Sequence, residues 1–566
     1  MLLSLPEDCI QSIAFLLSPP DILTFLSVHR NLHEKLSKTS SFWARLLCRD
    51  RDEEYHLNSA SKREDDDASI RQEFMIQAYK QYLPSIKWYP VTMQPNRQCL
   101  NIPEREGHVA CVLKGPRNEK WMCITGGFSD DRRVFVLRVP SRSRRHLSNA
   151  NSTEQPSTSD TSWRWTRLSP QHHASFVYGA SLTALPSVME DGVPVARALR
   201  FGGFESGGYS DETNEIWLLS VKEEQNEMMA SWERIDDSVN HHRVMPRAYH
   251  SATLVADRYL VIIGGMIWRG SVLQEAILDT QTWTWMDGSI STGDSDDKPS
   301  GRHGHSVIFD NRRNRLVLFG GGSGTDLLRS GSDNAEVWQL KMNQGWKTSL
   351  QFPWEWSRVH GDDSNEHDDD DESANDASSD ADMNSSAESS TEYNDRHHLS
   401  PAESLCLGRC HNGMKIAPDT ALLCFGGGRP NTNGVLGYNL SEDKFLRPGV
   451  EGTFLPQPRF TGVATFLDEE GYIFAHGGFA TEESEAIGEM DVLDLAPGLK
   501  RRFAGLPVDS TRPSYEAVTD QEAENMAPRP MGGFSLLNLL ASRLSGLDDM
   551  QQFLLMEGST LPGGGP

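Results

Sequence analysis

Arginine and histidine recur together in this chain, at matching points of successive segments. The pairs are Arg105 with His108, Arg247 with His250, Arg302 with His305 and Arg409 with His411, and a lone Arg459 follows. Both side chains form hydrogen bonds readily, and arginine is always charged. Brought together by a fold, they would form a polar ring able to line a binding mouth. The five arginines are therefore the candidate binding residues. The alternative is a structural role, in which the same groups tie neighbouring repeats by hydrogen bonds.

Other reactive side chains form no recognisable catalytic constellation. Cys406, Cys410 and His411 make a partial cluster without zinc spacing, and a buried-strand interpretation fits them better. No serine elbow, phosphate loop or paired-carboxylate motif stands out. We therefore expect no catalytic residue, no metal site and no cofactor. The eight scattered cysteines are typical of a reduced intracellular protein, so we expect a cytoplasmic or nuclear location.

The 566-residue chain has a formal net charge of −26, and this charge is unevenly distributed. Residues 361–395 hold fourteen Asp or Glu and no Lys or Arg. Such a run is typical of a solvated, disordered loop. Phosphate binding needs a basic patch, so we expect no nucleic-acid partner, whereas a basic protein partner is compatible with this charge. We also expect no membrane span, because no run reaches the ~18 apolar residues that a membrane helix needs.

One phrase recurs six times along the chain, an apolar run that ends in two glycines. The copies end at Gly127, Gly203, Gly265, Gly321, Gly427 and Gly478. Repetition of this kind indicates an array of similar units. In the clearest copy, residues 246–285, the pattern predicts four strands, with the glycines after the second and Trp283-Thr284-Trp285 in the fourth. Trp163–Trp165 and Trp354–Trp356 mark equivalent outer strands.

Four antiparallel strands per repeat, with an Arg-x-x-His-Ser type element upstream and a tryptophan downstream, resemble the kelch repeat, which folds as a blade of a β-propeller. The expected fold is mainly β, a propeller of about six four-stranded blades within residues 85–506. The last blade needs an outer strand from elsewhere in the chain. We favour Ile86–Val91 over Lys500–Leu506, because closing the ring from its other end removes an exposed edge. A seventh blade stays open as an alternative.

Successive connections in an antiparallel meander alternate between the two faces of the ring. The loop after the second strand and the link between blades are therefore expected on one face. The arginine–histidine elements and the loops Glu205–Thr213, Met266–Val272 and Gly322–Asp333 should meet a partner there. The acidic insert, at about 361–398, should hang from the same face.

The spacing of apolar residues in the first fifty positions predicts three short helices. Leu5-Pro6-Glu7 at the start and Trp43 with Leu46-Leu47 at the end enclose apolar positions at helical spacing, and this arrangement resembles an F-box. The resemblance implies docking on the Skp-type adaptor of a cullin-based ubiquitin ligase. The residues that it places against the adaptor are Leu5, Pro6, Ile10, Ile13, Leu16, Leu23 and Leu26. The alternative is a generic three-helix packing unit.

Two further segments complete the expected organisation. Residues 51–84 form a charged linker and a helix, Ile70–Leu83, that couples the F-box to the propeller. Residues 507–566 end in an amphipathic helix that packs on the ring or binds a partner. The two resemblances together imply a non-catalytic substrate receptor of a ubiquitin ligase, with adaptor and cullin at the F-box and a protein substrate on the propeller. The alternative is a scaffold that binds another protein without a ligase role.

Overall fold

The structure is a computed structural model of the whole chain. It describes residues 76, 79–81, 83–91, 102–116, 119–127, 133–139, 164–175, 177–205, 212–225, 227–235, 244–286, 298–324, 335–342, 354–360, 406–427, 431–467, 471–480 and 485–497. The predicted F-box at 1–50, the acidic insert at 361–398 and the segment 507–566 lie outside these residues.

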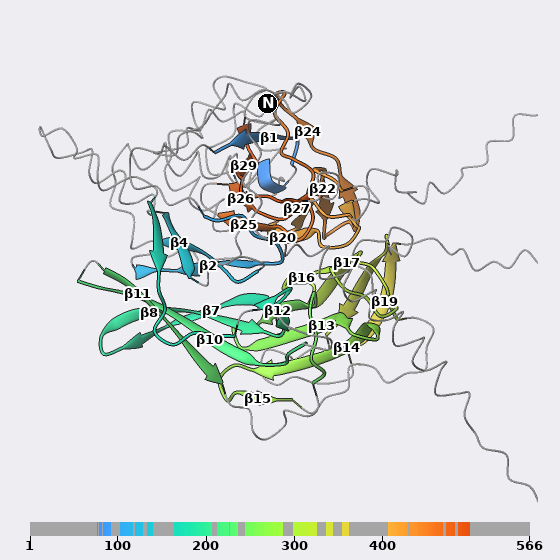
Figure 1. Cartoon of the computed structure of the whole chain (residues 1–566). Helices are drawn as coiled ribbons and strands as arrows, with labels where there is room; N and C mark the ends of the chain where they lie inside the picture. Colours follow the sequence, from blue (N-terminus) through green and yellow to red (C-terminus); the bar gives the residue numbers. More distant parts are fainter. Residues whose placement is uncertain are drawn as a thin grey trace, which may run out of the picture.

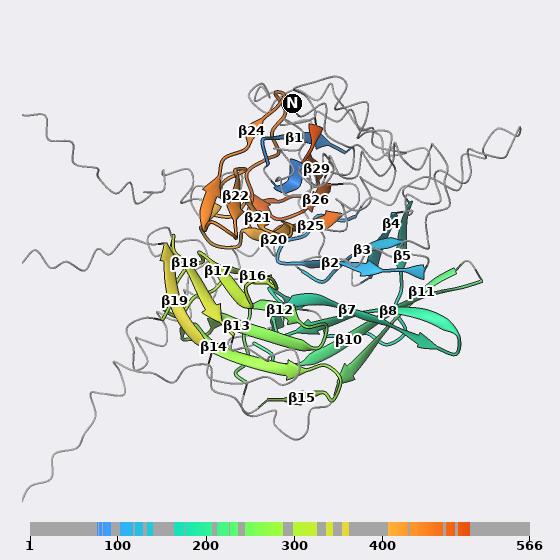
Figure 2. The same cartoon turned by 180° about the vertical axis from the view of Figure 1, so that it is seen from behind.

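Among the described residues, six β-sheets of four or five strands surround a central axis, as Figures 1 and 2 show from opposite sides. Blade 1 contains β2 (Val109–Lys114), β3 (Lys120–Thr125), β4 (Val134–Val139) and β5 (Arg164–Leu168). Blade 2 contains β7 (Ser181–Glu190), β8 (Val193–Phe201), β10 (Ile216–Glu224) and β11 (Glu227–Ile235). Blade 3 contains β12 (Ser251–Val255), β13 (Tyr259–Ile267), β14 (Gly270–Asp279) and β15 (Thr284–Trp285).

The other three blades complete the ring. Blade 4 contains β16 (Ser306–Asp310), β17 (Arg315–Phe319), β18 (Val337–Lys341) and β19 (Glu355–His360). Blade 5 contains β20 (Asn412–Ala417), β21 (Thr420–Cys424), β22 (Val435–Asn439) and β23 (Lys444–Leu446). Blade 6 contains β25 (Val463–Leu467), β26 (Tyr472–His476), β29 (Met490–Asp494), β1 (Ser85–Pro90) and the short β24 (Gly449–Val450). The first strands of neighbouring blades contact one another in a closed cycle, so each first strand lies on the inner wall. The predicted six-bladed propeller is confirmed.

The ring is closed by the N-terminal strand β1. It pairs antiparallel with β29, from Lys87 opposite Asp494 to Pro90 opposite Asp491, and occupies the position of the fourth strand. Strand β24 then adds to the outside of β1 in parallel. Trp88 is 2% exposed and packs in the core between blades 5 and 6. The prediction that Ile86–Val91 supplies the closing strand is therefore confirmed.

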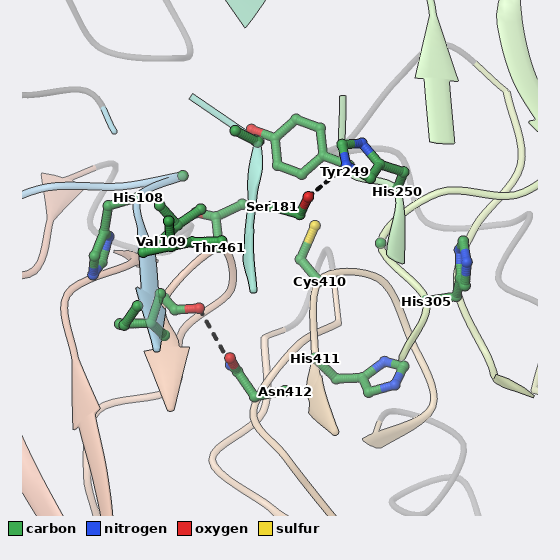
Figure 3. A pocket seen from close by; sticks show the side chains of 18 residues that line it. His108, Val109, Ser181, Tyr249, His250, His305, Cys410, His411, Asn412 and Thr461 are labelled. Atoms are coloured by element: carbon green, nitrogen blue, oxygen red, sulfur yellow. Dashed lines mark hydrogen bonds between the residues drawn. The ribbon is translucent and has the colours of Figure 1, made fainter. Parts of the chain in front are cut away.

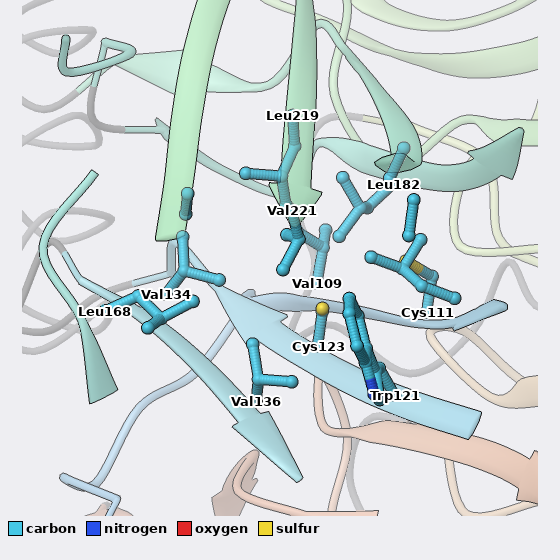
Figure 4. Packing of buried hydrophobic residues seen from close by; sticks show 14 of the residues in the cluster. Val109, Cys111, Trp121, Cys123, Val134, Val136, Leu168, Leu182, Leu219 and Val221 are labelled. Carbon is cyan, nitrogen blue, oxygen red and sulfur yellow. The ribbon is translucent and has the colours of Figure 1, made fainter. Parts of the chain in front are cut away.

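The second strands of blades 4, 5 and 6 are buried along their whole length, since neighbouring blades cover both faces of each sheet. This burial explains why the sequence there is a continuous apolar run and not an alternating pattern. Clusters of apolar side chains fill the space between each pair of adjacent blades. Figure 4 shows the cluster between blades 1 and 2, where Trp121 and Cys123 of β3 meet Leu182, Leu219 and Val221 of blade 2.

Blade 2 is longer than its neighbours, with strands of nine or ten residues where many others have five or six. The β7–β8 and β10–β11 hairpins carry this extra length beyond the ring (Figure 1). Met189, near the tip of β7, is 67% exposed. Arg138 of blade 1 holds the second hairpin through an ion pair with Glu223.

Candidate binding face

The connections between strands divide into two faces of the ring. Loops after the second strands touch the links that lead into the next blade: Gly203 N–H donates to the carbonyl of Arg247 at 2.9 Å, and Gly265 N–H to that of Arg302 at 2.8 Å. We call this side the glycine face and the other side, with the turns after first and third strands, the opposite face. The prediction that second-strand loops and inter-blade links share a face is confirmed.

A belt of main-chain hydrogen bonds runs around the glycine face, one from each blade to the next. Each donor is a glycine with φ between +81° and +119°, a region that favours residues without a Cβ. The donor–acceptor pairs are Gly127–Val177, Gly203–Arg247, Gly265–Arg302, Gly321–Leu407, Gly426–Arg459 and Gly478–Arg105. In blade 5 the donor is Gly426 and the residue before it, Phe425, has φ +60°. In blade 5, Phe425 and Gly426 thus occupy the positions that the two glycines occupy in the other blades. They lie one residue earlier than the glycine pair of the sequence phrase, which ends at Gly427.

The five candidate arginines are buried, with 0–1% of their surface exposed. In four of them Nη1 donates to the carbonyl of the first glycine of the same blade. These pairs are Arg105–Gly126 at 3.2 Å, Arg247–Gly264 at 2.9 Å, Arg302–Gly320 at 3.1 Å and Arg459–Gly477 at 3.3 Å. In two of them Nη2 also donates to a carboxylate at the start of the third strand, Glu336 at 2.8 Å from Arg302 and Asp491 at 2.7 Å from Arg459. These arginines therefore have a structural role, although their side chains bond within one blade and not between neighbouring blades. Direct contact of these arginines with a substrate stays a prediction.

Arg409 differs from the other four arginines. Arg409 comes one residue before the left-handed residue of its blade, Cys410, whereas each of the other four arginines comes two residues before the corresponding residue. Its side chain packs on Gly322 of blade 4. The sequence separation already differs, because His411 follows Arg409 by two residues and the other histidines follow by three. Equivalent motifs in the sequence thus take two different places in the ring.

Six residues with left-handed backbone, one from each blade, form a ring around the axis. They are Gly107, Gly179, Tyr249, Gly304, Cys410 and Thr461, with φ between +53° and +65°. Each of the first five donates its N–H to the carbonyl of the residue in the preceding blade, for example Tyr249 to Gly179 at 2.6 Å and Gly304 to Tyr249 at 2.8 Å. Sequence reasoning missed this axial ring. The available signal was glycine directly before histidine, and it is present only at Gly107 and Gly304.

The histidines that follow the axial ring bond to the neighbouring blade. His250 Nε2 lies 2.8 Å from Ser181 Oγ, and His305 Nε2 lies 3.0 Å from Ser251 Oγ. Figure 3 shows these side chains around the axis. Burial lowers the pKa of His250 to about 3 and that of His411 to about 4, so both imidazoles are neutral at pH 7. The hydrogen bonds of His250 and His305 tie neighbouring blades, as the structural alternative proposed, whereas His411 Nδ1 bonds to the carbonyl of Gly408 in its own link at 2.6 Å.

A cavity of about 230 Å³ lies on the central axis, lined by the residues of the axial ring and by the starts of the first strands (Figure 3). An apolar cluster lies above the ring, on the glycine face. Its members directly precede the axial ring, belong to it or follow the belt glycines: Tyr178, Phe204, Ala248, Tyr249, Met266, Cys410, Phe460 and Phe479. These side chains are 0–8% exposed, and we call them the apolar floor at the centre of the glycine face.

One loop predicted to contact a partner, Met266–Val272, is described in full. It is the hairpin of β13 and β14, with Trp268 and Arg269 at its two-residue turn. Trp268 is 49% exposed, and the Arg269 guanidinium lies 4.2 Å from the centre of its ring. The central parts of the other two loops lie outside the described residues. Strand β19, which precedes the acidic insert in the sequence, ends on the glycine face, because its last residue His360 pairs with Val337 beside the belt. The position predicted for the insert itself lies outside the described residues.

Among the described residues, no group of three or more His, Cys, Asp or Glu side chains could hold a metal ion. Cys406 and Cys410 are buried thiols in the link before β20. Within the same part of the chain, no helix is long and apolar enough to cross a membrane.

No protein-family model matches the chain. It is similar to an F-box/kelch-repeat protein of Arabidopsis thaliana, with 29% identity over 148 residues. That region spans 26% of this chain and 28% of the relative, so the match covers less than a third of either protein. The named repeat agrees with the blades described above, and we identify the ring of this chain as a kelch-type β-propeller.

Proposed function

We propose that this chain is the substrate-recognition subunit of a cullin-based ubiquitin ligase. Residues 1–50 would dock the Skp-type adaptor as an F-box, and the glycine face would bind a protein substrate. Such a subunit breaks no bond itself; it raises the local concentration of substrate beside the transferring enzyme. The F-box-like sequence and the similarity to an F-box/kelch-repeat protein support the proposal.

The observation that carries the proposal is how the N-terminal segment joins the ring. At the opposite face, Thr420 Oγ1 at the start of β21 donates to the carbonyl of Gln81 at 2.6 Å. Lys80 Nζ lies 5.0 Å from the ring of Phe466, also beside the turns of that face. The chain then runs along β1 toward the glycine face. Lys80 and Gln81, near the start of the described chain, thus lie at the end of the axis away from the glycine face.

The same connection is firmly packed. Ile76 is fully buried, and Leu83 and Ile86 belong to the core between blades 5 and 6. A receptor must hold its substrate at a definite place relative to the transfer site, and burial of the connecting residues favours a fixed geometry. The predicted coupling helix, Ile70–Leu83, is described at Ile76 and at Tyr79–Gln81, where it is helical. Leu83 itself lies past the helix, with φ +44°.

The test compares two leucine substitutions in the full chain. Leu16→Glu should abolish co-purification of the adaptor, because it puts a charge on the predicted apolar docking stripe. Leu57→Glu, in the charged linker, is the matched control and should retain the adaptor. Both variants should keep the circular dichroism spectrum of the folded propeller. Adaptor binding by Leu16→Glu at the wild-type level would contradict the proposal and favour a scaffold without a ligase role.

A further inference from the structure

The hairpin of β13 and β14 presents an aromatic and a cationic side chain on the glycine face. We call residues 266–271 the blade-3 hairpin. Aromatic residues and arginine supply a large share of the binding energy at protein interfaces, because they combine a wide apolar surface with hydrogen bonding or charge. Arg269 lies against the Trp268 ring, so the two side chains form one exposed unit.

The base of the blade-3 hairpin is fixed on both sides. Met266 and Ala248 exchange main-chain hydrogen bonds of 2.7 and 3.0 Å, and Met266 is part of the apolar floor. On the other strand, Ser271 Oγ donates to the carbonyl of Gly324 at 2.9 Å and lies 2.7 Å from His303 Nδ1. A braced hairpin loses little conformational entropy when a partner binds.

Exposed basic side chains accompany the blade-3 hairpin among the described residues, whereas the acids there are engaged. Over blades 3 and 4, the exposed charged side chains described on the glycine face are Arg269, Lys298 and Arg358, and Arg358 pairs with Glu336 at 3.7 Å. The acids are half-buried: Glu275 accepts from Trp356 Nε1 at 2.8 Å, and Glu336 from Arg302 at 2.8 Å. Over blades 6, 1 and 2 the described exposed charges on this face are mixed, namely Glu104, Glu205, Glu485, Arg167 and Arg234.

We propose that the blade-3 hairpin binds an acidic segment of the substrate, with an apolar side chain on Trp268 and a carboxylate on Arg269. This inference rests on the proposed function, since it names the class of segment that the receptor recognises. Arginine forms paired hydrogen bonds with a carboxylate, and the exposed Lys298 adds positive potential over the same two blades.

The experiment selects short random peptides from a phage-displayed library on the purified full chain and measures the affinity of the selected peptide by fluorescence anisotropy. The expected consensus has an aliphatic or aromatic residue beside two or more Asp or Glu. Trp268→Ala and Arg269→Glu should each weaken binding about 30-fold, the size of an interface hot spot. Met189→Ala, at an exposed apolar site on a hairpin of the opposite face, is the control and should bind as the wild type does.

Three results would overturn the inference. They are a basic consensus, an unchanged affinity in Trp268→Ala, and a library that yields no peptide. A fourth is a selected peptide whose affinity rises tenfold when residues 361–395 are deleted, since the acidic insert of the same chain would then be the occupant. None of these readouts involves the adaptor, so the inference can fail while the ligase proposal stands, and the Leu16→Glu test can fail while the peptide site stands.

Discussion

Main-chain geometry at single residues sets the shape of the glycine face. Gly320 has φ +56°, and a Cβ placed there would overlap the main chain of Leu407 in the next blade. Gly192, at the tip of the β7–β8 hairpin, has φ +81° but no heavy atom within 4 Å of such a Cβ. The two positions share an unusual backbone conformation and differ only in crowding. They therefore separate the cost of the conformation from the cost of the contact.

Gly192→Ala should lower the free energy of unfolding by about 1–2 kcal/mol, the cost of a left-handed backbone in a residue with a Cβ. Gly320→Ala should cost several kcal/mol more, because blade 5 must move away from blade 4 and weaken the Gly321–Leu407 hydrogen bond of 3.1 Å. Urea unfolding followed by circular dichroism measures both. Equal losses in the two variants would show that the belt tolerates a wider spacing between blades.

Buried imidazoles make the ring sensitive to acid. Burial lowers the pKa of His250, His303 and His476 to about 3, whereas an unfolded histidine titrates near 6.5. Above pH 6.5 these histidines are neutral in both the folded and the unfolded protein, so the free energy of unfolding does not depend on them. Below pH 6.5 the histidines of the unfolded chain take up protons that the folded chain excludes. The free energy of unfolding should therefore fall by about 1.4 kcal/mol per pH unit for each such histidine. Urea midpoints at pH 7, 6 and 5 test this, and His250→Gln should show a shallower decline. A constant midpoint would contradict it.

The strand elements were the most predictable part of the fold, because each has its own apolar run and turn residues. The tryptophans expected to mark outer strands do so: Trp165 is in β5, Trp285 in β15 and Trp356 in β19. The axial ring was not predictable in the same way. Three of its six members are Tyr249, Cys410 and Thr461, and their positive φ arises from contacts with neighbouring blades that no local pattern records. The burial of the arginines was missed for a related reason, since their acceptors are the carbonyls of glycines 17 to 21 residues away.

Strand β1 is an element whose importance can be measured by truncation. A chain that begins at residue 51 keeps β1 and should unfold in one cooperative transition near the wild-type temperature. A chain that begins at residue 92 loses the buried Ile86 and Trp88 and leaves an open edge on β29. Such an edge favours pairing with other chains, so this variant should aggregate during size-exclusion chromatography. A monomeric, cooperatively folding 92–566 chain would show that closure is dispensable.

On the scale of the whole molecule, the two faces of the ring meet different parts of the chain. Gln81 bonds to the opposite face, and the glycine face carries the blade-3 hairpin, the apolar floor and the end of β19. The sequence allowed the shared face of the second-strand loops and inter-blade links to be predicted, since that follows from the alternation of a meander. That Arg269 is exposed while the five candidate arginines are buried could not be predicted, because it depends on which charges are buried with partners.

The position of β1 also has a consequence for biosynthesis. Its partner β29 lies roughly 400 residues later in the chain, and a ribosome adds about 5–20 residues per second, so the nascent β1 waits about 20–80 s for its partner. Through that time Trp88 has no blade to enter, and the first five blades form an open arc with an exposed edge. Holding of this N-terminal segment by a chaperone, or by an early-bound partner of residues 1–50, would protect the chain until the final blade emerges. Assembly of the ring and assembly of the complex would then be linked in time.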